Sequence, residues 1–284
     1  MKTVLIPTDF STNAWNAIAY VLQLFKNDEV KFYLLHTYTP AFYRVDYFLG
    51  GPEFSAIPDV GVERSIAGLE KTLTQISQQY PNKKHKFETI SAFNTLTDEV
   101  RDQCKAKEIE LIVMGTQGAS GAKQLFLGSS TVFVIRKSSI PVLAIPENCS
   151  FKEIGNILLP HDYLSCCDAI DLEPLVFFAK HQKAKINVLH VKAASDLTEQ
   201  QLKNKAQLKE HLSDLPHLFT ELHGESMPNA ILDQADSDDF QLLVMLNRKH
   251  SFFEKILIRQ YVDQVGFHVK IPFLIIRDTT EKYS

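Results

Sequence analysis

The chain has 284 residues, of which 45% are hydrophobic and 23% are charged, and its formal net charge is −4. This balance is ordinary for a folded protein and excludes partners recruited by bulk charge alone, such as nucleic acids or membrane surfaces. No apolar run approaches the ~20 residues of a membrane-spanning helix. The four cysteines form no C-x-x-C pair and the N-terminus leads straight into a predicted strand. We therefore expect a reduced, cytoplasmic protein without a signal peptide.

Strand-like and helix-like segments alternate along the first half of the chain. Apolar runs predict strands near residues 2–7, 30–36, 84–90, 109–114 and 141–145. Helical apolar spacing occurs over residues 11–25, 62–79 and 95–106, and a further helix-like segment covers 131–137. This alternation predicts a parallel sheet with right-handed crossovers and helices on both faces.

The second half repeats the first. Four segments match in the same order: Val4–Phe10 with Ile157–Tyr163, Leu34–His36 with Val188–His190, Leu111–Met114 with Leu242–Met245, and Ile140–Leu143 with Ile271–Leu274. The last two pairs share one offset of 131 residues (242 − 111 and 271 − 140). We therefore expect two tandem Rossmann-like α/β units, each a five-stranded parallel sheet. The boundary is expected near Pro146–Gly155, which gives domains of residues 1–148 and 152–284.

A spaced glycine motif follows the fourth predicted strand. Gly115 and Gly118 are followed, after nine intervening residues, by Gly128, Ser129 and Ser130, just before a predicted helix. A strand, a glycine loop and a helix N-terminus in this order form an anion-binding geometry, because phosphate can approach the backbone N–H groups closely. The alternative is that the glycines only form turns and a simple helix cap.

The first predicted strand ends at Pro7-Thr8-Asp9, and the fourth ends at Met114. Ligands of such sheets bind beyond the carboxyl ends of the strands, where the winding direction switches. If these two strands are neighbours, Asp9 and the glycine loop face one crevice. The alternative for Asp9 is a capping role at the helix that starts near Ser11.

With these residues the chain resembles the universal stress proteins, in a tandem two-domain form. The family's nucleotide motif, G-x2-G-x9-G-[ST], is matched at every position by Gly115, Gly118, Gly128 and Ser129. The resemblance implies an adenine nucleotide site made of Pro7, Thr8, Asp9, Thr37 and Met114 around the base and ribose, and of Gly115, Gly118, Gly128, Ser129 and Ser130 at the phosphates.

The resemblance implies a regulatory stress-response protein that binds ATP or another adenine nucleotide in its first half. Whether Mg²⁺ binds with the nucleotide is left open. A weak ATPase or phosphotransferase and a ligand-free interaction module are the alternatives. No catalytic residue and no metal ligand is assigned. The last strands of the halves, 141–145 and 272–276, are expected to pair antiparallel as an intramolecular pseudo-dimer, and a homodimer is left open.

The second half lacks the motif. At the offset of 131, Gly115, Gly118 and Gly128 correspond to Leu246, Lys249 and Arg259, so a degenerate scaffold domain is predicted. The alternative is a site for another anion, formed by His161, Arg248, Lys249, His250 and Arg259. An aromatic segment, Tyr38–Pro58, occurs only in the first half, and it is expected to be a lid over the nucleotide or a dimer contact.

Overall fold

The computed structural model describes residues 1–38, 60–116, 127–165, 167–192, 196–223, 226–237, 239–248 and 270–277. The first half contains, in chain order, β1 (Thr3–Pro7), α1 (Thr12–Leu24), β2 (Val30–Tyr38), α3 (Val60–Gln79), β3 (His85–Phe93), α4 (Leu96–Ala106), β4 (Leu111–Gly115), α5 (Ser129–Lys137) and β5 (Val142–Ile145). The second half contains β6 (Asn156–Pro160), α6 (Ala169–Gln182), β7 (Lys185–Lys192), α7 (Glu199–His211), β8 (His217–His223), α8 (Met227–Asp236), β9 (Leu242–Asn247) and β10 (Phe273–Arg277).

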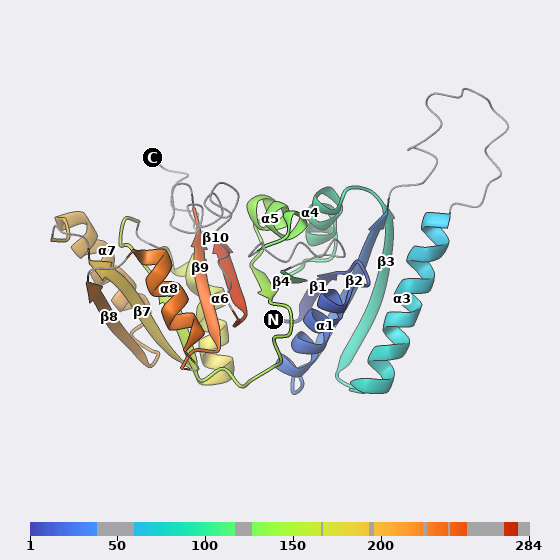
Figure 1. Ribbon diagram of the computed structural model, residues 1–284, viewed down its shortest axis with the longest axis horizontal. Coiled ribbons are helices and arrows are strands. Elements are labelled where there is room, and N and C mark those ends of the chain that lie inside the picture. The colour runs from blue at the N-terminus through green and yellow to red at the C-terminus, as the bar shows by residue number, and fades with distance from the viewer. Residues whose placement is uncertain are drawn as a thin grey trace, which may run out of the picture.

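The two halves form one ten-stranded sheet in the order β3-β2-β1-β4-β5-β10-β9-β6-β7-β8 (Figure 1). All strand pairs within a half are parallel, which confirms the predicted fold class. In the first half β1 pairs with both β2 and β4. The winding direction therefore switches between β1 and β4, and the carboxyl ends of these two strands lie side by side.

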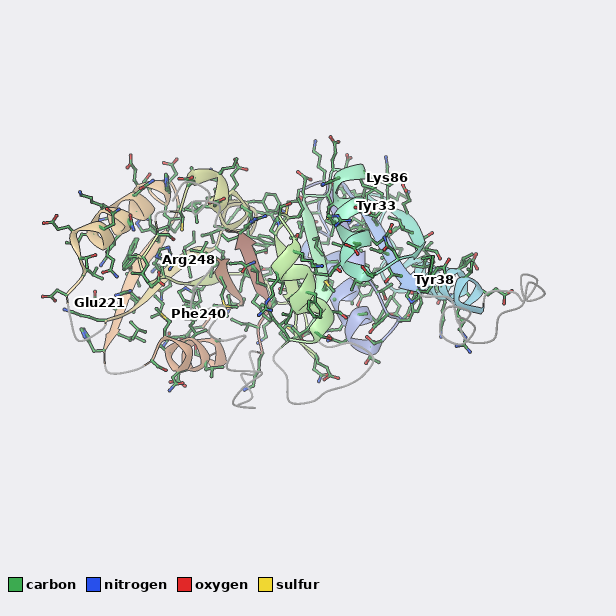
Figure 2. The ribbon with its side chains drawn as sticks, turned by 90° about the horizontal axis from the view of Figure 1, so that it is seen from above. Tyr33, Tyr38, Lys86, Glu221, Phe240 and Arg248 are labelled. Atoms are coloured by element: carbon green, nitrogen blue, oxygen red, sulfur yellow. The ribbon has the colours of Figure 1, made fainter. Side chains whose placement is uncertain are left out.

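Alternating strand residues build a separate core on each face of the sheet. On one face, residues such as Val4 and Leu111 pack with apolar side chains of α1, α3, α6 and α7. On the other face, residues such as Leu5 and Ile112 pack with α4, α5 and α8. Side chains fill the space between sheet and helices in both halves when the molecule is seen from above (Figure 2). Burial on both faces explains why inner strands such as β1 and β4 are continuous apolar runs.

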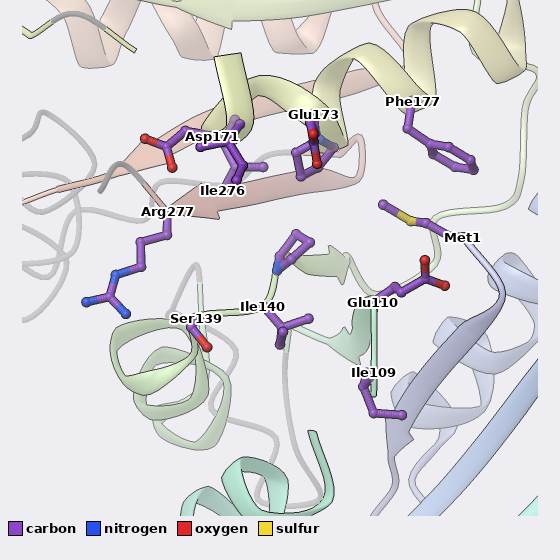
Figure 3. A pocket seen from close by; sticks show the side chains of 13 residues that line it. Met1, Ile109, Glu110, Ser139, Ile140, Asp171, Glu173, Phe177, Ile276 and Arg277 are labelled. Atoms are coloured by element: carbon purple, nitrogen blue, oxygen red, sulfur yellow. The ribbon is translucent and has the colours of Figure 1, made fainter. Parts of the chain in front are cut away.

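The halves meet at β5 and β10, which pair antiparallel as predicted. Leu143 lies directly opposite Leu274, and these two residues correspond at the offset of 131. A pseudo-twofold axis therefore passes between them, as in a dimer that uses the same surface twice. Next to this pair, a cavity of about 570 Å³ lies between α6 and the strand starts of the first half (Figure 3).

Candidate functional site

A pocket of about 240 Å³ lies at the carboxyl ends of β1, β2 and β4, against the start of α5. Nine of the ten residues predicted for the nucleotide site line it: Pro7, Thr8, Asp9, Thr37, Met114, Gly115, Gly128, Ser129 and Ser130. The tenth, Gly118, lies outside the described residues. The pocket is also lined by Ala14, Leu96 and Thr131, which the sequence did not single out. Ala14 and Leu96 have no distinctive chemistry, so only the fold reveals them.

The turn from β1 into α1 holds Asp9 at the pocket. Phe10 has a positive φ of 63°, and its N–H donates to the Thr8 hydroxyl (3.1 Å). The Ser11 N–H donates to Asp9 Oδ1 (3.0 Å), while the Ser11 side chain caps α1 by accepting from Ala14 N–H (3.1 Å). Ser11 is therefore the N-cap, and Asp9 stabilises the preceding turn while its side chain stays exposed at the pocket.

The end of β4 favours glycine at position 115. A Cβ added there would lie 2.9 Å from the side chain of Asn13, which is buried. The start of α5 is tied to this strand end, because Gly128 N–H donates to the Thr116 carbonyl (2.6 Å) and the buried Thr131 hydroxyl donates to the Gly115 carbonyl (2.9 Å). The loop ends that would hold a phosphate are thus held close together by hydrogen bonds.

Helix α5 begins at the pocket. Its N-cap is Gly128, which has no side chain, and its first turn contains no acidic residue. Ser129 and Ser130 are exposed and line the pocket. The N–H groups of a first helical turn and the positive end of the helix dipole attract anions. This end of the pocket is therefore suited to a phosphate, whereas Asp9 lines another part of it.

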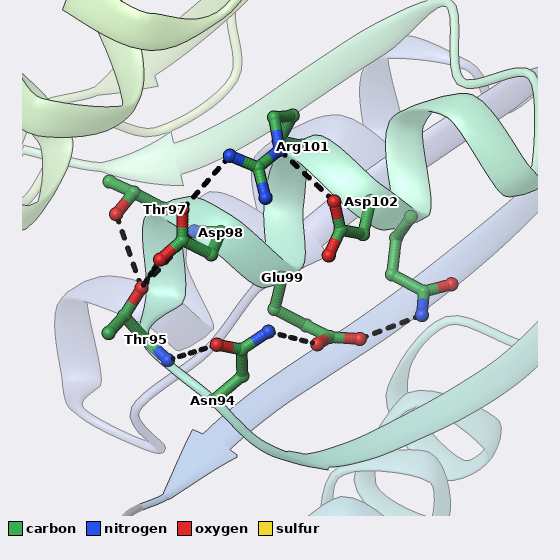
Figure 4. A network of polar contacts seen from close by, with 8 residues as sticks. Asn94, Thr95, Thr97, Asp98, Glu99, Arg101 and Asp102 are labelled. Carbon is green, nitrogen blue, oxygen red and sulfur yellow. Dashed lines mark hydrogen bonds and ion pairs between the residues drawn. The ribbon is translucent and has the colours of Figure 1, made fainter.

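A polar network fixes the start of α4, which contributes Leu96 to the pocket (Figure 4). The Thr95 hydroxyl donates to Asp98 Oδ2 (2.7 Å) and lowers the pKa of that carboxyl, and Thr95 also caps the helix. Asn94 Nδ2 donates to Glu99 Oε2 (2.9 Å). These contacts all lie within residues 94–99, and they order the first turn of α4, which carries Leu96.

His36 lies beside the pocket, one residue before Thr37. Its Nδ1 shares a hydrogen bond with Ser65 Oγ (2.9 Å), which in turn accepts from Ser91 Oγ (2.7 Å). The Phe10 ring stacks on the imidazole with centroids 4.5 Å apart. Burial lowers the pKa of His36, partly offset by the charge of Asp9. These contacts agree with a structural histidine that supports the pocket wall.

In the second half, the residue equivalent to Asp9 has a partner within the protein. Asp162 corresponds to Asp9, and it forms an ion pair with Arg248, whose side chain is only 9% exposed. Arg248 follows β9 in the second half and corresponds to Gln117 of the glycine loop (Figure 2). The second-half counterpart of Asp9 is thus paired with a cationic side chain of the same chain.

His161, which replaces Thr8, is buried in the second half. Its Nδ1 accepts from Tyr163 N–H (2.9 Å), and its Nε2 lies 3.3 Å from Cys167 Sγ. His190 Nδ1 donates to the His161 carbonyl (2.9 Å). His161 and Arg248, two of the five residues considered for a second anion site, therefore contact protein groups instead. The other three, Lys249, His250 and Arg259, lie outside the described residues.

Of the aromatic segment only Tyr38 lies within the described residues, with its ring 6.3 Å from that of Phe93. The segment's role as a lid or a dimer contact stays a prediction. In the described part of the chain, no helix is both long and apolar enough to cross a membrane. Across the same residues, no cluster of three or more histidine, cysteine or acidic side chains could hold a metal ion.

The model of the universal stress protein family matches residues 1–146 and 153–277. Universal stress protein MJ0577 of Methanocaldococcus jannaschii is 27% identical over 170 residues, which cover 52% of this chain and 97% of that protein. Universal stress protein YxiE of Bacillus subtilis is 29% identical over 145 residues, or 50% of this chain and 97% of that protein. The crystal structure of a universal stress protein from Archaeoglobus fulgidus covers 97% of this chain and 96% of its own, at 19% identity and a TM-score of 0.69, so it shares the fold.

Proposed function

Because the chain belongs to the universal stress protein family, we propose that its first half binds one adenine nucleotide, ATP or a close relative, and that the protein is a regulator controlled by this ligand. The observation that supports the proposal is the convergence of nine predicted site residues on one pocket at the switch point of the sheet. Pockets at this position are the usual ligand sites of parallel α/β sheets.

The pocket offers complementary groups to the parts of a nucleotide. The Asp9 carboxylate can accept hydrogen bonds from the adenine amino group or the ribose hydroxyls. Gly115 and Gly128 allow phosphate oxygens to approach the backbone. Ser129 and Ser130 would donate their hydroxyls and first-turn N–H groups to these oxygens. A bound nucleotide would change the surface that the pocket presents, and a partner protein could detect that change.

The second half supports a stoichiometry of one nucleotide per chain. Asp162 already has a cationic partner in Arg248, and that ion pair would have to break before the carboxylate could serve a ligand. The glycine motif is also lost, because Lys249 and Arg259 stand at the positions of Gly118 and Gly128. The tandem chain would therefore respond to nucleotide through its first half.

Isothermal titration calorimetry with ATP, ADP and AMP, each with and without Mg²⁺, tests the proposal. We expect one site per chain, and we expect Asp9→Ala and Gly128→Val each to weaken binding at least about tenfold, a loss of ~1.4 kcal/mol. The matched control is Gly155→Val, because a Cβ at Gly155 meets only Gln241, at an ordinary 3.6 Å. Two equal sites per chain, or unchanged affinity in Gly128→Val, would contradict the proposal.

A further inference from the structure

The cavity of about 570 Å³ at the joint of the halves is an open groove with an apolar floor. The first half contributes Met1 and Ile140, and α6 of the second half contributes Ile170 and Phe177. Met1 points across the groove toward Phe177 (Figure 3). Ile170 is 68% exposed, so an isoleucine at the groove has little protein covering it.

The pseudo-twofold axis gives this groove a counterpart on the other side of the joint. Ile140 and Pro141 of the groove correspond to Ile271 and Pro272 at the offset of 131. The floor is built alike on both sides. Glu110 Oε2 accepts from Thr3 N–H (3.1 Å), and Gln241 Oε1, at the same offset, accepts from Asn156 N–H (3.0 Å) at the start of β6.

The counterpart groove is filled by the linker between the halves. Its remaining cavity is only about 280 Å³ and is lined by Tyr20, by Ile271 and by linker residues within 148–152. Asn16 Nδ2 on α1 donates to the carbonyls of Pro146 and Cys149, both at 3.0 Å. The Phe151 ring packs edge-on against Tyr20 with centroids 5.3 Å apart. In this groove, the chain that leaves β5 thus crosses the joint and partly buries an aromatic side chain.

The chain that leaves β10 is placed to do the same. Arg277, the last residue of β10, corresponds to Pro146 at the offset of 131 and lines the open groove. The seven residues 278–284 follow it, as the seven residues 147–153 follow Pro146. They lie outside the described residues. We propose that residues 278–284 occupy the open groove and cross the joint, as the linker does in the counterpart groove.

The sequence of this segment suits the groove. Its one aromatic residue, Tyr283, is adjacent to the position that corresponds to Phe151. A seated Tyr283 would cover apolar surface at the joint and tie the second half to the first a second time.

Hydrogen exchange measured by mass spectrometry tests this proposal on the full chain and on a variant that ends at Arg277. We expect amides of residues 138–141 and 169–177 to exchange about tenfold faster in the shortened chain. Tyr283→Ala should produce most of this change and Tyr283→Phe little of it. Amides of the counterpart groove, residues 16–20 and 148–152, should be unaffected and serve as the internal control. Equal exchange at the open groove in the full and shortened chains would overturn the proposal.

Cross-linking tests the seating directly. The pair Ile170→Cys with Tyr283→Cys should form a disulfide within one chain, identified by peptide mapping. The pair Leu202→Cys with Tyr283→Cys is the control, because Leu202 is exposed on α7, away from the groove. A disulfide between two chains, together with light scattering that shows a dimer lost on shortening, would assign the groove to a second copy and overturn the intramolecular proposal. Cross-linking of the control pair alone would overturn it as well.

Discussion

The replacement Leu143→Ala tests whether β5 and β10 join the halves into one cooperative unit. Leu143 is 1% exposed and lies opposite Leu274, which is fully buried in the same core. The change removes roughly three methylene equivalents at ~0.8 kcal/mol each, and the cavity that remains adds to this loss. We therefore expect the free energy of unfolding to fall by about 3–4 kcal/mol. Leu274→Ala should cost a similar amount, because the two positions are related by the pseudo-twofold axis.

Urea unfolding followed by circular dichroism measures the loss, and hydrogen exchange shows which half opens. In a coupled molecule Leu143→Ala speeds exchange in β6 and β9 as well as in β1 and β4. The double variant should lose about 1 kcal/mol less than the summed single losses, because the two side chains are neighbours. Leu202→Ala, at an exposed position, should stay within about 0.5 kcal/mol. A shift confined to the first half, with the second half unfolding at an unchanged urea concentration, would refute the coupling.

Three further outcomes are expected. Gly115→Ala should cost about 1–2 kcal/mol of stability because its Cβ would lie 2.9 Å from a buried side chain, whereas Gly155→Ala should be nearly neutral in the same urea titration. Because the pKa of His36 is lowered, the unfolded chain takes up a proton at a higher pH than the folded chain does, so stability should fall as pH drops below about 6.5. His36→Gln should flatten this dependence. An equally steep profile in the variant would show that His36 is not its cause. Burial raises the pKa of Cys104 and of Cys149 to about 11, so mass spectrometry should find both alkylated on the order of 100-fold more slowly at pH 7.5 than a free thiol.

The sequence predicts most of the fold because its signals are local and strong. The apolar run Leu111–Met114 is buried on both faces of the sheet, and the observed β4 covers Leu111–Gly115. The antiparallel pairing of the last strands is predicted from the family resemblance and from the apolar edges of both strands, which pairing covers, and the structure confirms it. From the sequence, the adjacency of β1 and β4 was an assumption and not a prediction, because the order of strands in a sheet depends on the crossover connections and not on any one segment.

The candidate site was predicted in part. The glycine spacing and Asp9 carry their own chemistry, so the sequence identifies them, and they line one pocket. Leu96 could not be found, because an ordinary leucine gives no sign of which surface it faces. The pairing of Asp162 with Arg248 was also missed, because these residues are 86 positions apart. The alternative that Asp9 caps α1 was wrong, because the N-cap is Ser11, two residues later, whose side chain accepts a hydrogen bond from the Ala14 N–H.

The covalent joining of the two halves has an evolutionary consequence. In a dimer of identical subunits every mutation occurs twice, so a residue that closes one binding site closes both. When both units are encoded in one reading frame, each can diverge while the shared strand pair between Leu143 and Leu274 is kept. Arg248 could thus arise opposite Asp162 without any change beside Asp9. Duplication followed by fusion therefore allows this architecture to divide labour between its halves, which a symmetric assembly cannot do.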